Sequence, residues 1–132
     1  MSTTTHHRTD AQAIVEAWAS AYNDQDFDRF GTLYADDVPY TCAAFGLAFT
    51  GRDAFVAHVK EYAGAVPDRK MTIQRIIADG DAIAVEFAFA GTSSGVHPAL
   101  PPKGEPVRTT FCTVLTLRDG KIASQTDYVG GQ

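Results

Sequence analysis

The order of patterns along the chain predicts an α+β fold with one curved antiparallel sheet. Apolar residues recur at helical spacing through much of the first half, and strand-like alternation dominates the second half. Two Asp-Gly pairs, Asp79-Gly80 and Asp119-Gly120, mark tight turns between antiparallel neighbours. Three helices laid across the concave side of such a sheet would form a cone, and cones of this kind hold small-molecule pockets.

Two helices are predicted in the first quarter of the chain, over residues 10–23 and 27–34. Asp10 is suited to cap the first, because its side chain can accept a hydrogen bond from a free backbone amide. The polar run Asp24-Gln25-Asp26 separates the two helices. Their buried faces are predicted to carry Ile14, Val15, Trp18 and Tyr22, and then Phe27, Phe30, Leu33 and Tyr34.

A short strand over residues 38–42 and a third helix over residues 52–65 are predicted next, joined by a loop. Pro39 indicates an edge position for this strand, because proline lacks the amide hydrogen that an inner strand donates. Thr50 and Asp53 have the spacing of a capping box at the start of the helix, with Asp in place of the usual Glu or Gln.

Four strands are predicted in the second half, over residues 71–78, 82–90, 107–117 and 122–129. A long loop rich in glycine and proline separates the middle two and contains His97. Such a loop over the mouth of a cone could act as a lid. A solvated loop histidine is the commoner alternative.

Length and composition bound the class of protein. The chain has 132 residues, a net charge of −5 and a pI near 5.2. We expect one domain over residues 10–132 after a disordered tail over residues 1–9. The acidic charge argues against nucleic acid and membrane as partners, and no apolar run approaches the roughly 20 residues that span a bilayer. A polar start without a visible signal peptide makes the cytoplasm the expected location.

The two cysteines, Cys42 and Cys112, lie far apart in strand-like segments. Neither has the spacing of a CxxC pair or of a metal site with histidine, so we expect buried structural thiols and no metal. The sequence also lacks a phosphate loop, a nucleophile elbow and a dinucleotide fingerprint, so we expect chemistry without a cofactor.

Asp127 and His58 are the candidate acid–base residues. His58 shares the core face of the third helix with Phe55 and Tyr62, so we expect it to be interior and to need a polar partner. A carboxylate at Asp127 among aromatic residues would have its pKa raised by desolvation, which suits a general acid or base near neutral pH. The alternatives are a core histidine bonded to the backbone and an aspartate in solvent.

The turn at Asp119-Gly120 determines which face of the sheet carries Asp127. With a two-residue loop, Asp127 falls opposite Cys112. With a three-residue loop, it falls opposite Phe111, on the face of Thr113, and a slip of one residue exchanges the faces. The Arg-Asp-Gly sequence suits the three-residue form, because glycine tolerates a positive φ, so we predict that form and an inward Asp127.

A set of mostly aromatic side chains is expected to line a pocket for a flat hydrophobic ligand. Each of them, taken alone, is more typical of plain core packing. The hydroxyls of Tyr22 and Tyr40 could orient a ligand oxygen. The predicted ligand-binding residues are Trp18, Tyr22, Tyr40, Phe55, Tyr62, Phe87, Phe89, His97, Phe111 and Thr113.

Short segments spread along the chain carry a family resemblance. They are Val15-Glu16-Ala17-Trp18, Leu33-Tyr34-Ala35-Asp36-Asp37-Val38, Gly51-Arg52-Asp53-Ala54, Ala78-Asp79-Gly80-Asp81, Leu100-Pro101-Pro102-Lys103-Gly104 and Arg118-Asp119-Gly120-Lys121-Ile122. From Ala13 to Tyr128 the chain thereby resembles the SnoaL-like polyketide cyclases of the nuclear transport factor 2-like superfamily. The resemblance implies a cone-shaped α+β barrel of the NTF2-like or cystatin-like kind, and a homodimer packed through the convex face of the sheet.

The resemblance also implies roles for single residues. In the cyclases, an aspartate on the final strand is the acid–base group of an intramolecular aldol closure, and Asp127 matches it. Their partner histidine on the preceding strand would fall near Thr113, where this chain has no histidine. His58, reaching from the third helix, could substitute for it.

Two other branches of the superfamily match less well. Ketosteroid isomerases use a tyrosine, an aspartate base and a further acid at places that fall near Trp18, Cys42 and Thr113. Limonene-epoxide hydrolases need an arginine and a second aspartate on a middle strand, where this chain offers only Glu86.

Two functions are therefore expected as alternatives. The first is a cofactor-independent enzyme of the cyclase or isomerase type, in which Asp127 moves a proton next to a carbonyl of a hydrophobic small molecule. His58 would orient Asp127 or polarise the developing enolate oxygen. The second is a non-catalytic small-molecule binder or a dimeric interaction module, which the missing histidine at Thr113 favours.

Overall fold

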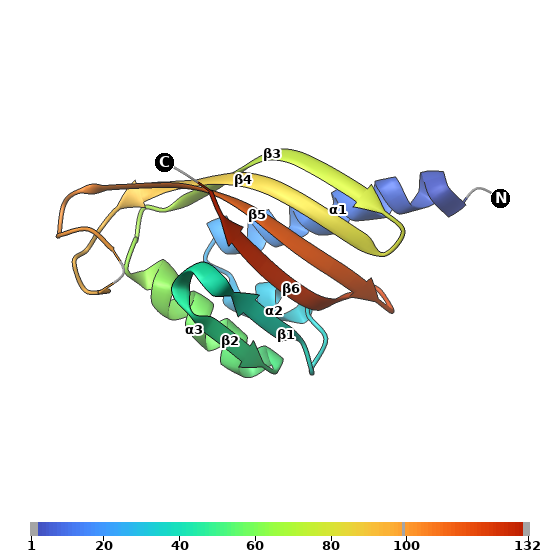
Figure 1. The fold of residues 1–132 in the computed structure, drawn as a ribbon, viewed down its shortest axis with the longest axis horizontal. Helices are drawn as coiled ribbons and strands as arrows, with labels where there is room; N and C mark the ends of the chain where they lie inside the picture. Colours follow the sequence, from blue (N-terminus) through green and yellow to red (C-terminus); the bar gives the residue numbers. More distant parts are fainter. Residues whose placement is uncertain (1–2, 99, 131–132) are drawn as a thin grey trace.

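A computed structural model of the protein describes residues 3–98 and 100–130. Three helices come mainly from the first half of the chain and the longer strands from the second (Figure 1). The helices are α1 (Thr3–Asn23), α2 (Phe27–Thr32) and α3 (Arg52–Gly64), with a 3-10 turn, η1 (Ala43–Phe45). The strands are β1 (Pro39–Cys42), β2 (Leu47–Thr50), β3 (Lys70–Asp79), β4 (Ala82–Thr92), β5 (Pro106–Arg118) and β6 (Lys121–Val129).

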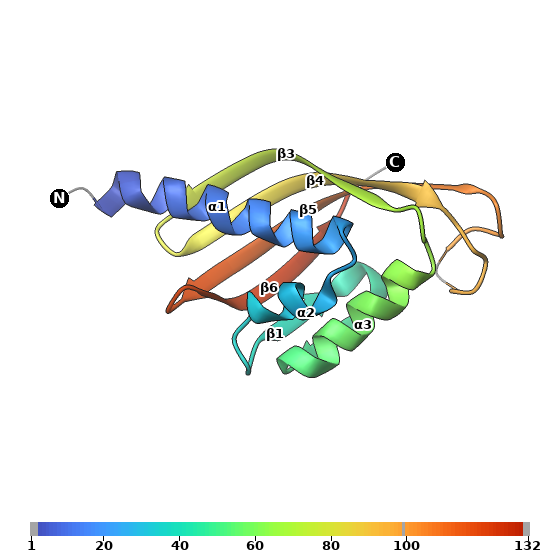
Figure 2. The same cartoon turned by 180° about the vertical axis from the view of Figure 1, so that it is seen from behind.

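The strands form one curved six-stranded sheet in the order β2-β1-β6-β5-β4-β3. Figure 2 shows all three helices in front of one face of this sheet. The buried apolar side chains of helices and sheet form one continuous core cluster between the two layers. The predicted α+β fold, with helices on the concave side of a curved sheet, is confirmed.

β1 is an inner strand, so the edge position predicted from Pro39 is wrong. It pairs antiparallel with β2 and parallel with β6, which makes the sheet mixed. Its pairing with β6 involves only Tyr40 and Thr41, so the missing amide hydrogen of Pro39 is not needed on that side. β2 itself lies in the segment for which a loop was predicted, because four residues between two glycines give too short a pattern to detect.

α1 begins at Thr3, so the part of the predicted disordered tail that the structure describes is helical. Residues 3–9 contain neither glycine nor proline, and nothing therefore stops the helix before Asp10, which lies inside it. The first two residues of the tail lie outside the described residues.

The start of α3 also differs from the prediction. Gly51 is the N-cap, with φ of 105°, and no side chain forms a capping hydrogen bond, so the capping box predicted from Thr50 and Asp53 is wrong. Thr50 is already the last residue of β2, and its backbone is fixed by pairing with Pro39. Glycine is required at the junction because the chain turns there with a positive φ.

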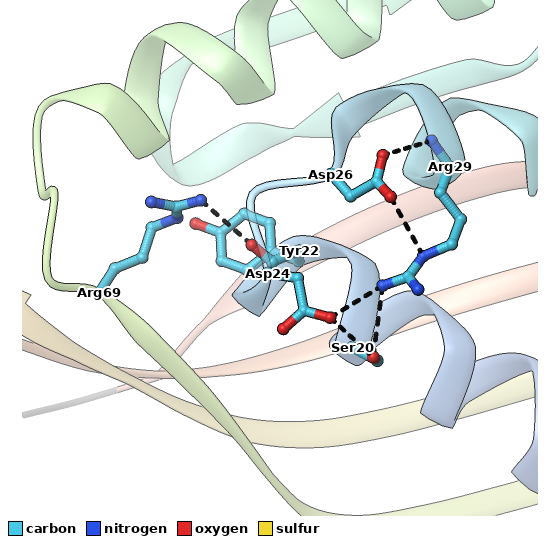
Figure 3. Close-up of polar contacts among 6 residues, drawn as sticks. All are labelled: Ser20, Tyr22, Asp24, Asp26, Arg29 and Arg69. Atoms are coloured by element: carbon cyan, nitrogen blue, oxygen red, sulfur yellow. Dashed lines mark hydrogen bonds and ion pairs between the residues drawn. The ribbon is translucent and has the colours of Figure 1, made fainter.

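A polar cluster fixes the junction of α1 and α2 (Figure 3). The Asp26 side chain accepts a hydrogen bond from the Arg29 backbone amide at 3.1 Å and so caps α2. The Arg29 guanidinium donates to Asp24 at 3.1 Å. Both partners of this ion pair are exposed, so the cap contributes more to the junction than the charges do.

Arg69 joins the ends of two helices from inside the core. It is 6% exposed and donates to the backbone carbonyl of Tyr22 at 3.1 Å (Figure 3). It also donates to the backbone carbonyl of Ala63, at 3.4 Å. These carbonyls lie in the last turns of α1 and α3, where a cation is favoured by the helix dipole. The guanidinium also lies 4.8 Å from the Tyr22 ring centroid. It therefore links the C-terminal ends of α1 and α3.

The cysteines are both free. Cys42 is 1% exposed, as expected of a structural thiol. Cys112 is only partly buried, because its side chain points to the outer face of β5, opposite Tyr128. Among the helices of the described residues, none is both long and apolar enough to cross a bilayer.

Candidate active site

The β5–β6 hairpin points Asp127 inward by a route that differs from the predicted one. Arg118 pairs with Lys121, so the loop has two residues, and both have positive φ, 54° at Asp119 and 77° at Gly120. This is the geometry of a type I′ turn, and the predicted three-residue turn is wrong. A bulge follows at once, because Thr116 pairs with Ser124 while Leu117 pairs with Ile122.

The bulge gives β6 one extra residue, Ala123, which shifts the register by one. Asp127 therefore lies opposite Thr113, not opposite Phe111 or Cys112. Thr113 is 0% exposed and faces the helices, so Asp127 faces inward with it. The expected orientation of Asp127 is confirmed, although neither predicted register is the observed one.

In the described part of the chain, the Asp127 carboxylate accepts three hydrogen bonds, and each donor is a neutral side chain. The Tyr40 hydroxyl donates to Oδ2 at 2.7 Å. The Thr113 hydroxyl donates to Oδ1 at 2.7 Å, and the Gln125 amide donates to the same oxygen at 3.1 Å. The carboxylate is thus held by β1, β5 and β6 together.

Burial raises the pKa of Asp127 above its ordinary value, because the charged form loses its hydration. The hydrogen bonds from Tyr40, Thr113 and Gln125 oppose this effect, since each of them stabilises the carboxylate. Burial also raises the pKa of Tyr40, and the Asp127 charge raises it further, so Tyr40 stays protonated and can donate. Burial is the largest of the effects on Asp127, so its pKa lies above the ordinary value for an aspartate.

Asp127 and Gln125 form the polar wall of a cavity of about 360 Å³. Aromatic rings supply most of the remaining surface and pack against one another. The ring centroids of Phe87 and Phe111 are 5.1 Å apart, and those of Tyr40 and Phe55 are 4.6 Å apart. The cavity therefore combines a few polar groups, two of them acidic (Glu61 and Asp127), with a largely aromatic interior, as many small-molecule sites do.

Most of the predicted ligand-binding residues lie around this cavity. Only Thr113 does not line it directly, and it acts instead as a donor to Asp127. The residues that line it as predicted are Trp18, Tyr22, Tyr40, Phe55, Tyr62, Phe87, Phe89, His97 and Phe111. The additional lining residues are Phe30, Phe45, Leu47, Phe49, Val59, Glu61, Met71 and Gln125.

For some of these additional lining residues, alternation along a strand indicates a side chain that points inward. Gln125 lies two residues before Asp127 on the same strand, so any register that turns Asp127 inward also turns Gln125 inward. Leu47 and Phe49 alternate in the same way within β2, but that strand was not recognised. Phe45 belongs to η1, which precedes β2, and no periodicity marks it.

His58 lines the same cavity as Asp127 but does not bind it. Within the described residues, no hydrogen bond joins the two side chains, and all three donors to Asp127 are other residues. The His58 ring instead packs against Phe49, with 5.0 Å between ring centroids. Burial lowers the pKa of His58, while the Glu61 charge raises it. A directly bonded Asp–His pair is therefore not present.

A chain of hydrogen bonds continues from Asp127 into the core. The Trp18 indole donates to the Tyr34 hydroxyl at 2.8 Å, and Tyr34 donates to the Gln125 side-chain oxygen at 2.5 Å. Gln125 then donates to Asp127. Neither the Tyr34 hydroxyl nor this chain was predicted, because its members come from distant parts of the sequence.

His97 lines the cavity, with 5.5 Å between its ring centroid and that of Tyr62. The long loop that carries it therefore contacts α3. In the part of the chain that the structure describes, no three His, Cys, Asp or Glu side chains are arranged to hold a metal ion.

Comparison with known proteins relates the chain to one family. The model of the SnoaL-like domain family matches residues 15–125. A search of curated proteins gives no match.

Among solved structures, a protein from Catenulispora acidiphila with a ketosteroid isomerase-like fold, in complex with trimethylamine, is 29% identical, with a TM-score of 0.74 over 87% of this chain and 83% of that one. An LEH-like epoxide hydrolase from M. tuberculosis is 27% identical, with a TM-score of 0.74 over 92% and 84% of the two chains. IdmH from Streptomyces antibioticus, a proposed polyketide cyclase, is 23% identical, with a TM-score of 0.77 over 90% and 91%.

Proposed function

The chain belongs to the SnoaL-like domain family, and from this membership and the chemistry of its cavity we propose that it is an enzyme of the polyketide cyclase or isomerase type. Its substrate is a hydrophobic small molecule that carries a carbonyl group. The observation that supports this most directly is the Asp127 carboxyl group, whose pKa burial raises, in the wall of an otherwise aromatic cavity.

Asp127 acts as the general base. It takes a proton from the carbon next to the carbonyl, and the electron pair of the broken C–H bond moves to the carbonyl oxygen as an enolate. In an isomerase the proton returns to another carbon. In a cyclase the enolate carbon attacks a second carbonyl of the same molecule, and the proton passes from Asp127 to the resulting alkoxide. Both sequences balance without an oxidant, a reductant or a cofactor.

His58 and Tyr40 are the donors proposed for the enolate oxygen. Burial lowers the pKa of His58, so its ring is neutral at pH 7 and offers one N–H as donor. Tyr40 is 4% exposed, and its hydroxyl already lies beside Asp127. A donor placed where charge develops stabilises the transition state more than the substrate.

The cavity favours a flat, uncharged substrate. Its volume of about 360 Å³ lies near the lower end of the usual range for ligand sites, about 300–1,000 Å³. Glu61 and Asp127 are the acidic groups around it, and the opposing walls are aromatic. An anionic substrate would meet these carboxylates without a lysine or arginine among the cavity residues.

Asp127→Asn is the direct test. It removes the base and keeps the size of the side chain, so turnover of ketone and polyketide substrates should fall by about 100- to 10,000-fold, while ligand binding remains. Asp119→Asn makes the same chemical change at the exposed turn of the same hairpin and should leave turnover intact. Full turnover by Asp127→Asn would refute the assignment.

A second candidate function is the binding of a ligand without chemistry. The absence of a hydrogen bond between His58 and Asp127 within the described residues favours it. A carboxylate among aromatic rings also suits an amine cation, and one similar structure contains trimethylamine. Calorimetric binding of trimethylamine or a ketone, with the ligand recovered unchanged after long incubation, would support this function over catalysis.

A homodimer through the convex face is part of the proposal. Ile77 and Tyr128 are 51% and 58% exposed there, on strands whose opposite faces are buried. Large apolar side chains at such a sheet face are typical of an interface. Sedimentation should give a dimer for the wild type and a monomer for Tyr128→Glu, and a monomeric wild type would contradict this part of the proposal.

A further inference from the structure

A chain of three hydrogen bonds leads from the core to one oxygen of Asp127. It starts at the Trp18 indole on α1, passes through the Tyr34 hydroxyl after α2, and reaches Oδ1 of Asp127 through the Gln125 amide on β6. Trp18, Tyr34 and Gln125 are 2%, 0% and 4% exposed, so water does not compete for these bonds. Three buried polar side chains thus form a hydrogen-bonded chain that ends at the Asp127 carboxylate.

The chain can run in one direction only. The indole N–H of Trp18 is a donor and cannot accept, so the Tyr34 oxygen must accept from it. The single hydroxyl hydrogen of Tyr34 is therefore free to be donated, and it goes to the carbonyl oxygen of the Gln125 side chain. The amide of Gln125 is thereby fixed with its NH₂ group toward Asp127. A glutamine without this constraint could rotate and offer its oxygen instead.

Fixed donors leave no room for a proton on Oδ1. This oxygen accepts from Thr113 at 2.7 Å and from Gln125 at 3.1 Å, which uses both of its lone pairs. Oδ2 accepts only from Tyr40, at 2.7 Å, in the part of the chain that the structure describes. The two oxygens of the same carboxyl group are therefore not equivalent.

We propose that Trp18, Tyr34 and Gln125 are positioning residues that keep Oδ1 of Asp127 a permanent hydrogen-bond acceptor, so that the carboxyl group exchanges protons through Oδ2. The inference rests on the proposed role of Asp127 as acid–base group. In the forward step the C–H bond of the substrate breaks and an O–H bond forms on Oδ2. That O–H is then directed toward Tyr40 and the cavity, from which it returns the proton.

The titratable groups around Asp127 do not explain why its two oxygens differ. The titratable groups that act on Asp127 are Tyr40 on β1 and His58 on α3, and Asp127 in turn acts on Tyr22, Tyr34 and Cys42. Burial raises the pKa of Tyr34, which is therefore neutral in the working range. Removing its hydroxyl changes no charge, and within the described residues Gln125 is the residue that forms hydrogen bonds with both Tyr34 and Asp127, so we expect a change at Asp127 to pass through Gln125.

The test is the carboxyl titration of Asp127, followed by ¹³C NMR without a substrate. Tyr34→Phe frees Gln125 to rotate and accept a hydrogen bond from the protonated carboxyl, which stabilises the neutral form. The pKa of Asp127 should rise by about one unit, the equivalent of a typical hydrogen bond. Gln125→Met removes the donor and should raise it by a similar amount. Tyr128→Phe, on the outer face of β6, should leave it unchanged.

The combination of the two changes separates a positioning role from a structural one. In a Gln125→Met background, Tyr34→Phe should produce no further shift, because the chain acts only through Gln125. An equal shift in both backgrounds, or an unchanged pKa in Tyr34→Phe alone, would overturn the inference. If Tyr34→Phe does not fold, Trp18→Phe removes the first donor and should shift the pKa in the same direction.

Kinetics supply an independent readout once a substrate is known. The acid limb of the kcat/KM profile should move upward in Tyr34→Phe by the shift seen in the titration, while KM stays constant. If Asp127→Asn keeps full activity, the proposed function fails, and the NMR titration still decides whether the chain fixes Oδ1. The two failures are therefore distinguishable.

Discussion

Thr113 and Asp127 lie directly opposite each other on β5 and β6, and the Thr113 hydroxyl donates to Oδ1 of Asp127 at 2.7 Å. Thr113 occupies the place where the cyclase resemblance would put a histidine. A hydroxyl can donate a hydrogen bond there but carries no charge, so it stabilises the carboxylate without titrating near neutral pH. The proton chemistry proposed for the site therefore falls to Asp127.

Thr113→Val should raise the pKa of Asp127. Valine keeps the shape of threonine but removes a donor to the charged form, and the loss of one such bond corresponds to about one pKa unit. NMR titration of the carboxyl group measures the change. Thr126→Val, on the outer side of β6, is the matched control and should leave the titration as it is.

The stability of the protein should depend on the titration of Asp127 with a defined sign. Burial raises its folded pKa above the unfolded value of about 3.9, so between the two values the folded state binds more protons. The contribution of Asp127 to stability is then fully present below pH of about 4 and is lost as the pH rises through the folded pKa.

Urea unfolding at a series of pH values measures this contribution. The unfolding free energy of the wild type should fall relative to that of Asp127→Asn as the pH is raised from about 4 toward neutrality. A constant difference between the two proteins across this range would contradict the raised pKa.

Arg69→Met should destabilise the fold by about 1–3 kcal/mol, because the buried carbonyls of Tyr22 and Ala63 lose a charged donor and each keep a backbone amide donor. Arg69→Lys should restore only a part, since an ammonium group lacks the planar fork that reaches both carbonyls. Urea denaturation provides the comparison. Full rescue by lysine would show that charge alone matters at this position.

Gly91→Ala and Gly64→Ala should have opposite effects on stability. A Cβ at Gly91 would lie 2.4 Å from Val66 Cγ1 and 3.1 Å from the Arg69 backbone, so the core must shift, which costs about 1–3 kcal/mol. A Cβ at Gly64 meets no atom within 4 Å, and alanine favours the last turn of α3 by about 0.5–1 kcal/mol. Thermal unfolding of the two variants checks both signs.

The sequence was sufficient for the fold and for most of the cavity wall, because both depend on periodic patterns. Helical spacing in α1 identified Trp18 and Tyr22, and alternation in β4 identified Phe87 and Phe89. Features that depend on a single residue were missed. Nothing in the local pattern distinguishes Ala123 as a bulge residue, and the short β2 is no longer than an ordinary loop.

The contacts between distant residues were equally out of reach. Tyr34 and Gln125 are 91 positions apart, and only the assembled sheet and helices bring them within a hydrogen bond. His58 was correctly expected beside the cavity, because its helix face could be derived from spacing. Its separation from Asp127 depends on how far α3 lies from β6, which no periodic pattern encodes.

The extra residue in β6 has a consequence for comparing relatives of this chain. Along β6, successive side chains point to opposite faces of the sheet, so the number of residues between the Asp-Gly turn and Asp127 decides which face Asp127 occupies. Ala123 adds one residue to this number. A relative that lacks this residue, with the same turn, would present its aspartate to the outside of the sheet. Two relatives can therefore carry the same site residues and still differ in whether the aspartate faces the cavity. A one-residue gap after the turn in their alignment is then a better indicator of this difference than their overall sequence identity.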